Sequence, residues 1–174
     1  MKFLNMLKEW GIIIITAIVM AFLIQTFIFD TRIVPSLSMY PTIEKNDRLI
    51  NSKLSYIFGE VQRGDIVVFK APESTGLTDD LVKRVIALPG ETFEVKEGAV
   101  YINGTKLDEP YLQVIPTYTY AKVTVPENCY IMLGDNRNAS IDSHMWSDPF
   151  LHKDYIIGKA ICRYWPFDRL GWLN

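Results

Sequence analysis

Three short segments of this chain contain side chains able to perform nucleophilic or acid–base chemistry. The first, residues 34–43, reads VPSLSMYPTI and combines two prolines with the hydroxyl groups of Ser36 and Ser38. Proline restricts the backbone, so this segment is expected to be irregular and stiff, and suited to holding a serine hydroxyl in one exposed geometry. A polar linker would have the same composition, and the segment alone does not distinguish the two.

The second segment, residues 81–91, reads LVKRVIALPGE and places Lys83 and Arg84 inside the apolar pattern of a strand. One of these two side chains must therefore point toward the less polar face. Removal from water disfavours the ammonium ion, lowers the pKa of a lysine and makes its neutral amine available as a base at about pH 7 to 9. An edge-strand lysine in solvent is the alternative.

The third segment, residues 132–146, reads MLGDNRNASIDSHMW and is very polar for a loop that follows an apolar strand. Its side chains include Asp135, Ser140 and Asp142. Such a density of hydrogen-bonding groups is typical of a scaffold that holds a catalytic side chain in place, and equally of a structural turn network.

The two histidines, His144 and His152, leave a second catalytic chemistry open. A Ser-His-Asp triad of Ser38, His144 and Asp142 is compatible with the composition. The sequence lacks the motifs G-x-S-x-G and H-E-x-x-H, which disfavours an α/β-hydrolase elbow and a zinc protease. Ser38 and Lys83 lie 45 positions apart, so the sequence by itself does not place them in contact.

Composition and charge exclude several other classes of function. With 174 residues, 49% hydrophobic residues and a net charge of −2, the chain can bury a core and has no basic stripe for binding nucleic acid. Cys129 and Cys162 lack the spacing of a zinc site, and each lies in an apolar run. We expect two buried free thiols, with a disulfide as the alternative if the domain lies outside the cytoplasm.

Residues 11–29, GIIIITAIVMAFLIQTFIF, contain no charged side chain. As a helix this run would cover about 28 Å, close to the thickness of the hydrocarbon core of a bilayer. It is longer than the apolar region of a cleavable signal peptide and ends without the small residues of a cleavage site, so a retained membrane anchor is predicted. Lys2 and Lys8 precede it, and the positive-inside rule then places residues 1–10 in the cytoplasm and residues 30–174 on the far side of the membrane.

After residue 30 the pattern predicts a mainly β domain with an antiparallel sheet. Asn103-Gly104 is the strongest short signal for a hairpin, because both turn positions favour positive φ. The predicted strands are residues 65–69, 81–88, 92–96, 99–102 and 130–133. The other expected features are a short helical turn within residues 46–56 or 148–155, and loops at residues 73–80 and 113–121.

The order of four sequence blocks resembles the type I signal peptidases of bacteria, in particular the Gram-positive-type members with one membrane span. The blocks are residues 35–42, 64–69, 83–90 and 134–143, and the tail at residues 158–167 is also similar. The resemblance covers essentially the whole chain. It implies a barrel-like antiparallel β domain, the signal peptidase I fold, behind one N-terminal transmembrane helix.

The same resemblance implies roles for individual residues. Ser38 is the expected nucleophile and Lys83 the general base, with no metal or organic cofactor. Ser36 and the backbone N–H of Ser38 would bind the oxyanion, and Ser140 would orient the lysine amine. The expected supporting polar cluster is Arg84, Asp135 and Asp142. The side chains expected to border a shallow substrate pocket are those of Val34, Pro35, Met39, Ile43 and Val82.

Three positions depart from the pattern of the family. His144 stands where members commonly carry Arg, Ala139 where Asn is common, and Leu37 where Gly is frequent. A histidine would make the ion pair with Asp142 weaker or dependent on pH. None of these changes removes a catalytic residue, so activity is expected. Residues 101–125 leave little room for the larger second β subdomain of the family, which predicts a minimal member.

The implied activity is removal of N-terminal signal peptides from secreted preproteins at the outer face of the cytoplasmic membrane, after small residues at positions −3 and −1. The expected partners are these preproteins and membrane lipid, with Trp165, Phe167 and Trp172 as candidates for lipid contact. One rival is the Ser-Lys self-cleavage domain of LexA-like repressors, which normally accompanies a DNA-binding module. Another is a non-enzymatic, membrane-tethered assembly factor that keeps the peptidase fold, although such a protein should lack the serine or the lysine.

Overall fold

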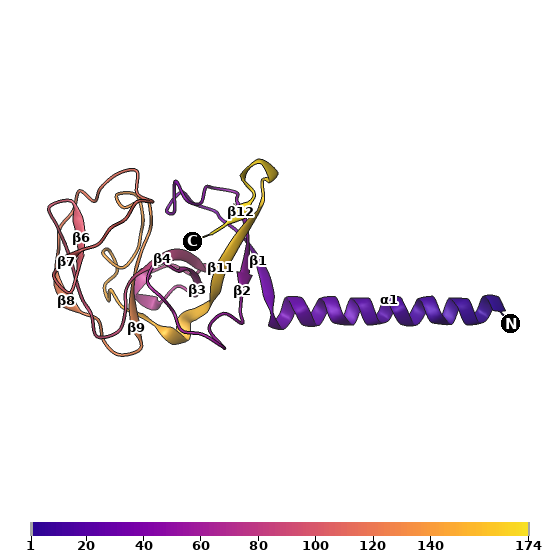
Figure 1. Cartoon of the computed structure of the whole chain (residues 1–174). Coiled ribbons are helices and arrows are strands. Elements are labelled where there is room, and N and C mark those ends of the chain that lie inside the picture. Colours follow the sequence, from indigo (N-terminus) through magenta and orange to yellow (C-terminus); the bar gives the residue numbers. More distant parts are fainter. Residues whose placement is uncertain (1, 174) are drawn as a thin grey trace.

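The computed structural model describes residues 2–173, which form a long N-terminal helix and a β domain (Figure 1). The helix α1 (Lys2–Phe27) projects away from the β domain. Its segment Glu9–Phe27 has a mean hydropathy of 2.2, and none of this segment is buried against the rest of the described chain. An apolar surface of this length is stabilised by lipid rather than by water, so α1 is a candidate membrane span.

The helix ends at Phe27, two residues before the predicted end of the span, because the chain turns into a strand at Phe29. Lys53 stabilises this junction. Its Nζ donates a hydrogen bond to the carbonyl oxygen of Thr26 at 2.9 Å, and its backbone N–H donates to that of Ile28 at 2.9 Å. A cation at the C-terminus of a helix also interacts favourably with the helix dipole.

The β domain of residues 29–173 consists of two antiparallel sheets. The larger sheet has eight strands in the order β1-β2-β11-β3-β4-β9-β10, with β12 paired to β11. Its strands are β1 (Phe29–Ile33), β2 (Arg48–Ser52), β3 (Ile66–Phe69), β4 (Leu81–Ala87), β9 (Cys129–Leu133), β10 (Leu151–His152), β11 (Ile156–Trp165) and β12 (Gly171–Trp172). The larger sheet is curled, and β3 and β4 are central strands in its order (Figure 1). The predicted mainly β, antiparallel fold class is confirmed.

The smaller sheet lies at the end of the domain that is remote from α1 (Figure 1). It has four strands in the order β7-β6-β5-β8. These strands are β5 (Thr92–Lys96), β6 (Ala99–Ile102), β7 (Thr105–Lys106) and β8 (Tyr120–Thr124). Short 3-10 helices lie at η1 (Glu73–Thr75), η2 (Lys153–Tyr155) and η3 (Phe167–Arg169).

All five predicted strands are present as β3, β4, β5, β6 and β9, each within one residue of the predicted bounds. The predicted hairpin is also confirmed. Asn103 has φ 52° and Gly104 has φ 81°, and Ile102 pairs with Thr105 across the turn. Both Cys129 and Cys162 are free and half-buried, so the disulfide alternative is not formed.

Other local predictions were wrong or incomplete. Residues 46–56 contain the strand β2 rather than a short helical turn, whereas residues 148–155 do contain the 3-10 helix η2. The predicted loop at residues 113–121 ends in the strand β8. The longest strand, β11, was not predicted, because Gly158, Lys159 and Arg163 divide it into short apolar runs.

The strand β3 is buried on both faces and forms the centre of the domain. Ile66 and Val68 pack into a core cluster with Met39, which belongs to the segment after β1. Val67 and Phe69 pack into a second cluster with residues of β4 and β9. Each fully buried aliphatic side chain contributes roughly 1.5–3 kcal/mol, so the strands beside β3 are held firmly.

The strand β4 lies between β3 and β9 and carries both charged residues of the second sequence segment. Lys83 pairs with Val67 of β3, and Arg84 pairs with Leu133 of β9. Neither residue is on a sheet edge, which rules out the edge-strand alternative for Lys83.

Candidate active site

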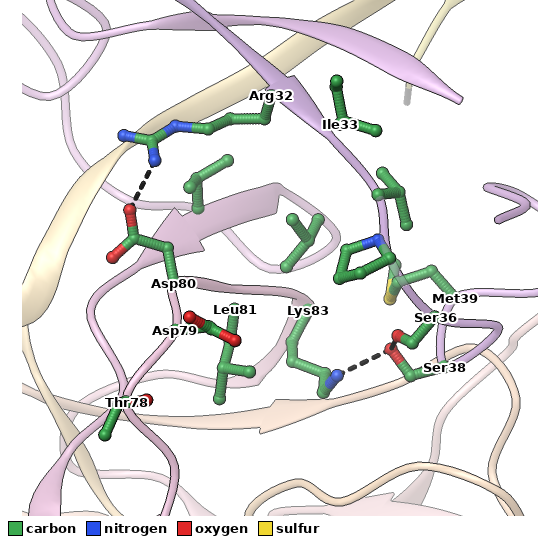
Figure 2. Close-up of a pocket in the computed structure, with 14 residues that line it drawn as sticks. Arg32, Ile33, Ser36, Ser38, Met39, Thr78, Asp79, Asp80, Leu81 and Lys83 are labelled. Carbon is green, nitrogen blue, oxygen red and sulfur yellow. Dashed lines mark hydrogen bonds and ion pairs between the residues drawn. The ribbon is translucent and has the colours of Figure 1, made fainter. Parts of the chain in front are cut away.

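The side chains of Ser38 and Lys83 meet in the interior of the β domain (Figure 2). Lys83 Nζ donates a hydrogen bond of 2.7 Å to Ser38 Oγ. Only 3% of Lys83 and 9% of Ser38 are exposed to solvent. Met39 and Ile43, both fully buried, anchor the segment that carries Ser38, so the nucleophile candidate lies directly before a packed core position.

Burial lowers the pKa of Lys83 from 10.5 to about 8. The charges of Asp142 and Asp135 act in the opposite direction and keep this decrease from being larger. A large part of the Lys83 population is therefore neutral at mildly alkaline pH, and a neutral amine can accept the proton of the Ser38 hydroxyl.

Ser36 lies beside Ser38, with 3.3 Å between the two hydroxyl oxygens. The Ser36 side chain is exposed, and its hydroxyl donates to Ser38 Oγ. A hydroxyl in this place can rotate toward an oxyanion that forms on a carbonyl attacked by Ser38.

We call residues 134–144, which follow β9, the catalytic loop. Ser140 Oγ in this loop is buried and has no hydrogen-bond partner among the described residues. A Cβ on Gly134 would lie 2.3 Å from Ser140 Oγ and 2.3 Å from the carbonyl oxygen of Ser38. Only glycine therefore allows the catalytic loop to approach the Ser38 backbone this closely.

Asp135 joins three segments of the site. It accepts hydrogen bonds from Arg84 Nε at 2.9 Å and from an Arg84 terminal nitrogen at 2.8 Å. Thr42 Oγ1, from the segment that carries Ser38, donates to the same carboxylate at 2.5 Å. Because Arg84 and Asp135 are both buried, their two-pronged pair fixes β4 relative to the catalytic loop. The Thr42 hydrogen bond adds the serine segment to the same arrangement.

Asp142 is fully buried and holds the other end of the catalytic loop. One carboxylate oxygen accepts the backbone N–H of Gly134 at 2.8 Å, and the other lies 2.6 Å from His144 Nδ1. The His144 ring stacks on Tyr118 with a centroid distance of 3.9 Å. His144 therefore bonds to Asp142, while the Ser38 hydroxyl bonds to Lys83 and Ser36, so this arrangement is not that of a Ser-His-Asp triad.

A hollow of about 530 Å³ opens on one side of the Ser38–Lys83 pair (Figure 2). The predicted pocket residues among its lining are Val34, Pro35, Met39 and Val82. Ile43, the remaining predicted pocket residue, is fully buried in the core and is not part of this lining. An ion pair between Arg32 and Asp80 closes the end of the hollow opposite the catalytic pair.

A second hollow of about 360 Å³ overlaps the first, because both are lined by Ser36, Ser38, Lys83 and residues 78–81. Its further lining includes Leu77, Ala139 and Ile141. The Ser38–Lys83 pair therefore lines both of these adjoining hollows, which together offer room for an extended peptide beside it.

Sequence reasoning missed Glu109, Tyr111 and Tyr118, which contact the site from the stretch between β7 and β8. Tyr111 lies under the Arg84 guanidinium, with 4.0 Å from the central carbon to the ring centroid. Glu109 binds Arg137 of the catalytic loop. These three residues match no motif, and only the tertiary structure brings them to the site.

The fold and the site together define a class of protein: a mainly β domain in which a serine hydroxyl meets a buried lysine amine, as in serine hydrolases that use lysine as the general base. The family model "Signal peptidase, peptidase S26" matches residues 7–165. The chain therefore belongs to the signal peptidase family of serine endopeptidases, and the resemblance found in its sequence blocks is confirmed.

Individual relatives agree with this assignment. The signal peptidase I of Leptolyngbya laminosa is 46% identical over 163 residues, which cover 91% of this chain and 79% of the relative. Signal peptidase I S of Bacillus subtilis is 40% identical and covers 95% of this chain and 93% of the relative. A crystal structure of a signal peptidase I from Enterococcus faecalis has 34% identity, covers 57% of this chain and 96% of that chain, and has a TM-score of 0.47.

Replacement of Lys83 by methionine tests whether its amine is held away from water. The folded-state pKa is about 8 and the reference value is 10.5, so between these two values the unfolded chain binds more protons at this residue than the folded chain. The wild type should gain stability as pH rises through this window, by about 3 kcal/mol at most. Lys83→Met should lack this gain.

The measurement is chemical unfolding of both full-length proteins in detergent, followed by tryptophan fluorescence from pH 7 to 11. Lys83→Met should exceed the wild type in unfolding free energy at pH 7, with the difference shrinking above pH 8. Parallel curves for the two proteins would show that Lys83 is not desolvated.

Proposed function

We propose that this protein removes N-terminal signal peptides from secreted preproteins, with Ser38 as nucleophile and Lys83 as general base. The observation that carries the proposal is the buried 2.7 Å contact between the Lys83 amine and the Ser38 hydroxyl, in a chain of the signal peptidase family. A non-enzymatic assembly factor would have no need for this pair.

The reaction proceeds by acyl transfer. Neutral Lys83 takes the proton of the Ser38 hydroxyl as Oγ bonds to the scissile carbonyl carbon. The resulting ammonium then gives this proton to the leaving amine as the C–N bond breaks, which leaves an ester on Ser38. Lys83 next takes a proton from water as the water oxygen attacks the ester. Return of the proton to Ser38 Oγ releases the signal peptide with a new carboxylate.

The groups around the pair assist these proton transfers. The Ser36 hydroxyl and the backbone N–H of Ser38 are the proposed donors to the oxyanion of the tetrahedral intermediate. Ser140 Oγ is the proposed partner that orients the Lys83 amine. Arg84, Asp135 and Asp142 hold the strand and the loop that carry these residues.

The first hollow is the proposed binding site for the residues just before the cleaved bond. Its walls include Val34, Met39 and Val82, and buried side chains stand directly behind them. A wall packed in this way cannot retreat to accept a large side chain. We therefore propose small residues at positions −1 and −3 of the substrate.

The membrane arrangement is proposed from α1 and the charges near it. With Lys2 and Lys8 in the cytoplasm, α1 crosses the cytoplasmic membrane once and the β domain lies outside. Trp165, Phe167 and Trp172 are exposed aromatic side chains of the β domain and are proposed to contact lipid.

Removal of either member of the catalytic pair should abolish cleavage. Ser38→Ala loses the nucleophile and Lys83→Met loses the base, so each should lower the rate by several orders of magnitude with an unchanged circular dichroism spectrum. The wild-type rate should rise with pH as Lys83 loses its proton near pH 8. The measurement is preprotein cleavage followed by mass spectrometry of the products.

Surface substitutions provide matched controls for the catalytic pair. Ser147→Ala and Lys96→Met change exposed side chains of the same types and should cleave as the wild type does. The double variant His144→Ala, His152→Ala should keep a measurable fraction of the activity. Complete loss in this double variant, or substantial activity in Lys83→Met, would contradict the Ser-Lys mechanism and favour the triad.

Substrate size at positions −1 and −3 should decide the rate. A preprotein with Ala at both positions should be cut far faster than one with Leu or Phe there, because bulk overlaps the packed pocket wall. The comparison is kcat/KM for a matched series of preproteins. Similar values for Phe and Ala at position −1 would refute the shallow-pocket proposal.

Labelling in intact cells tests the membrane arrangement. In a variant without Cys129 and Cys162, a cysteine at position 75 should react with a membrane-impermeant thiol reagent, whereas one at position 5 should not. The reverse pattern would place the β domain in the cytoplasm.

A further inference from the structure

Residues 107–119 connect β7 and β8, two strands of the smaller sheet, and this stretch lies against the catalytic loop. We call this stretch the connector. Asn138 of the catalytic loop donates a hydrogen bond to the carbonyl oxygen of Ile115 at 3.0 Å and accepts the N–H of Thr117 at 2.8 Å. Tyr118 stacks on His144 at the far end of the same loop.

The strongest contact between connector and loop is a buried ion pair. The two terminal nitrogens of Arg137 bind the two carboxylate oxygens of Glu109 at 2.9 and 2.5 Å. The side chains are 0% and 6% exposed, respectively. The planar, two-pronged geometry fixes the direction of the guanidinium as well as its position.

Arg137 passes this constraint to the backbone around the nucleophile. Its Nε donates to the carbonyl oxygen of Gly134 at 3.1 Å. Gly134 is the residue that allows the catalytic loop to approach the Ser38 backbone closely, and it also lies against the Ser140 hydroxyl. Asn136, two residues further along the loop, also holds the nucleophile. Its N–H donates a hydrogen bond to the carbonyl oxygen of Ser38 at 3.0 Å.

Tyr111 connects this pair to the second buried arginine of the site. Its hydroxyl donates to Glu109 at 2.7 Å, and its ring supports the guanidinium of Arg84. Arg84 in turn binds Asp135, two residues before Arg137. One connector segment therefore supports the arginine of β4 and the arginine of the catalytic loop together.

A buried ion pair contributes little net stability, because removing both charges from water costs about as much as their attraction returns. Its physical effect is to select one geometry. We propose that Glu109 and Tyr111 are positioning residues for peptide cleavage, acting through Arg137 and Arg84 on the peptides that hold Ser38 and Ser140. This inference rests on the proposed function of the site.

Kinetics of Glu109→Gln test the inference. Loss of the carboxylate frees the Arg137 guanidinium and lets Gly134 shift, and a displacement of this kind costs rate rather than ground-state binding. At a temperature well below the melting point, kcat should fall at least about tenfold while KM stays within about twofold. The assay uses full-length protein in detergent and a preprotein with Ala at positions −1 and −3.

Two further variants and a control sharpen the test. Tyr111→Phe keeps the ring over Arg84 but removes the hydroxyl, and kcat should fall about threefold. The double variant Glu109→Gln, Arg137→Gln should lose no more activity than Arg137→Gln alone, because both changes act on one contact. Glu94→Gln removes a half-buried carboxylate of the smaller sheet, paired only with Lys96 in the described contacts, and should leave kcat unchanged.

The outcomes separate a positioning role from a purely structural one. A lower melting temperature with wild-type kcat in Glu109→Gln, or multiplied losses in the double variant, would overturn the inference. If Glu109→Gln does not fold, an unchanged kcat in Tyr111→Phe would overturn it and a reduced kcat at unchanged KM would support it. A wild-type protein that cuts no preprotein would instead overturn the proposed function, and the inference with it.

Discussion

Lys83 carries its amine into the interior of the larger sheet, 2.7 Å from the Ser38 hydroxyl, and the rest of the structure is arranged around this contact. An ammonium group is strongly hydrated, and a lysine on a sheet edge would extend its long side chain into water. The position of β4 between β3 and β9 prevents this, because both neighbouring strands are packed into core clusters. Desolvation then lowers the pKa of the amine into a range where it can act as a base.

The carboxylates near the amine would undo this effect if they were unpaired. Asp135 and Asp142 both raise the pKa of Lys83 by their negative charge. Asp135 is bound by Arg84 in a two-pronged pair, whereas Asp142 faces His144. An arginine stays charged at all relevant pH values, but a histidine is charged only when protonated. An arginine at position 144 could also bind both carboxylate oxygens of Asp142, whereas the His144 ring contacts one of them through Nδ1.

The connection between α1 and the site is short. Ten residues, 28–37, lie between Phe27, the last residue of α1, and Ser38, and they include β1 and one wall of the first hollow. Arg32 of β1 pairs with Asp80 across the end of this hollow. The first hollow therefore lies against the segment that leaves α1.

The sequence by itself determined the features that depend on neighbouring residues. Length and hydropathy of one run predict the helix, and Asn103-Gly104 predicts its hairpin. Short β-branched or aromatic runs bounded by turn residues predict β3 to β6 and β9. The strands β2 and β11 were missed because polar and charged residues leave each of them only short apolar runs. They are stabilised by pairing with each other across about a hundred residues of chain. Pairing between distant segments leaves no local pattern.

Some residues of the candidate site could also be predicted from the sequence, whereas others became evident only from the tertiary structure. Ordered sequence blocks identified Ser38, Lys83, Ser140, Arg84, Asp135 and Asp142, and the structure brings all of them together. Only the tertiary structure decided that Ile43 belongs to the core rather than to the pocket lining, and that Glu109 and Tyr111 reach the catalytic loop. The pKa of Lys83 belongs to this second group, because it reflects the combined burial and charge of side chains from β3, β4 and the catalytic loop, which no single stretch of sequence contains.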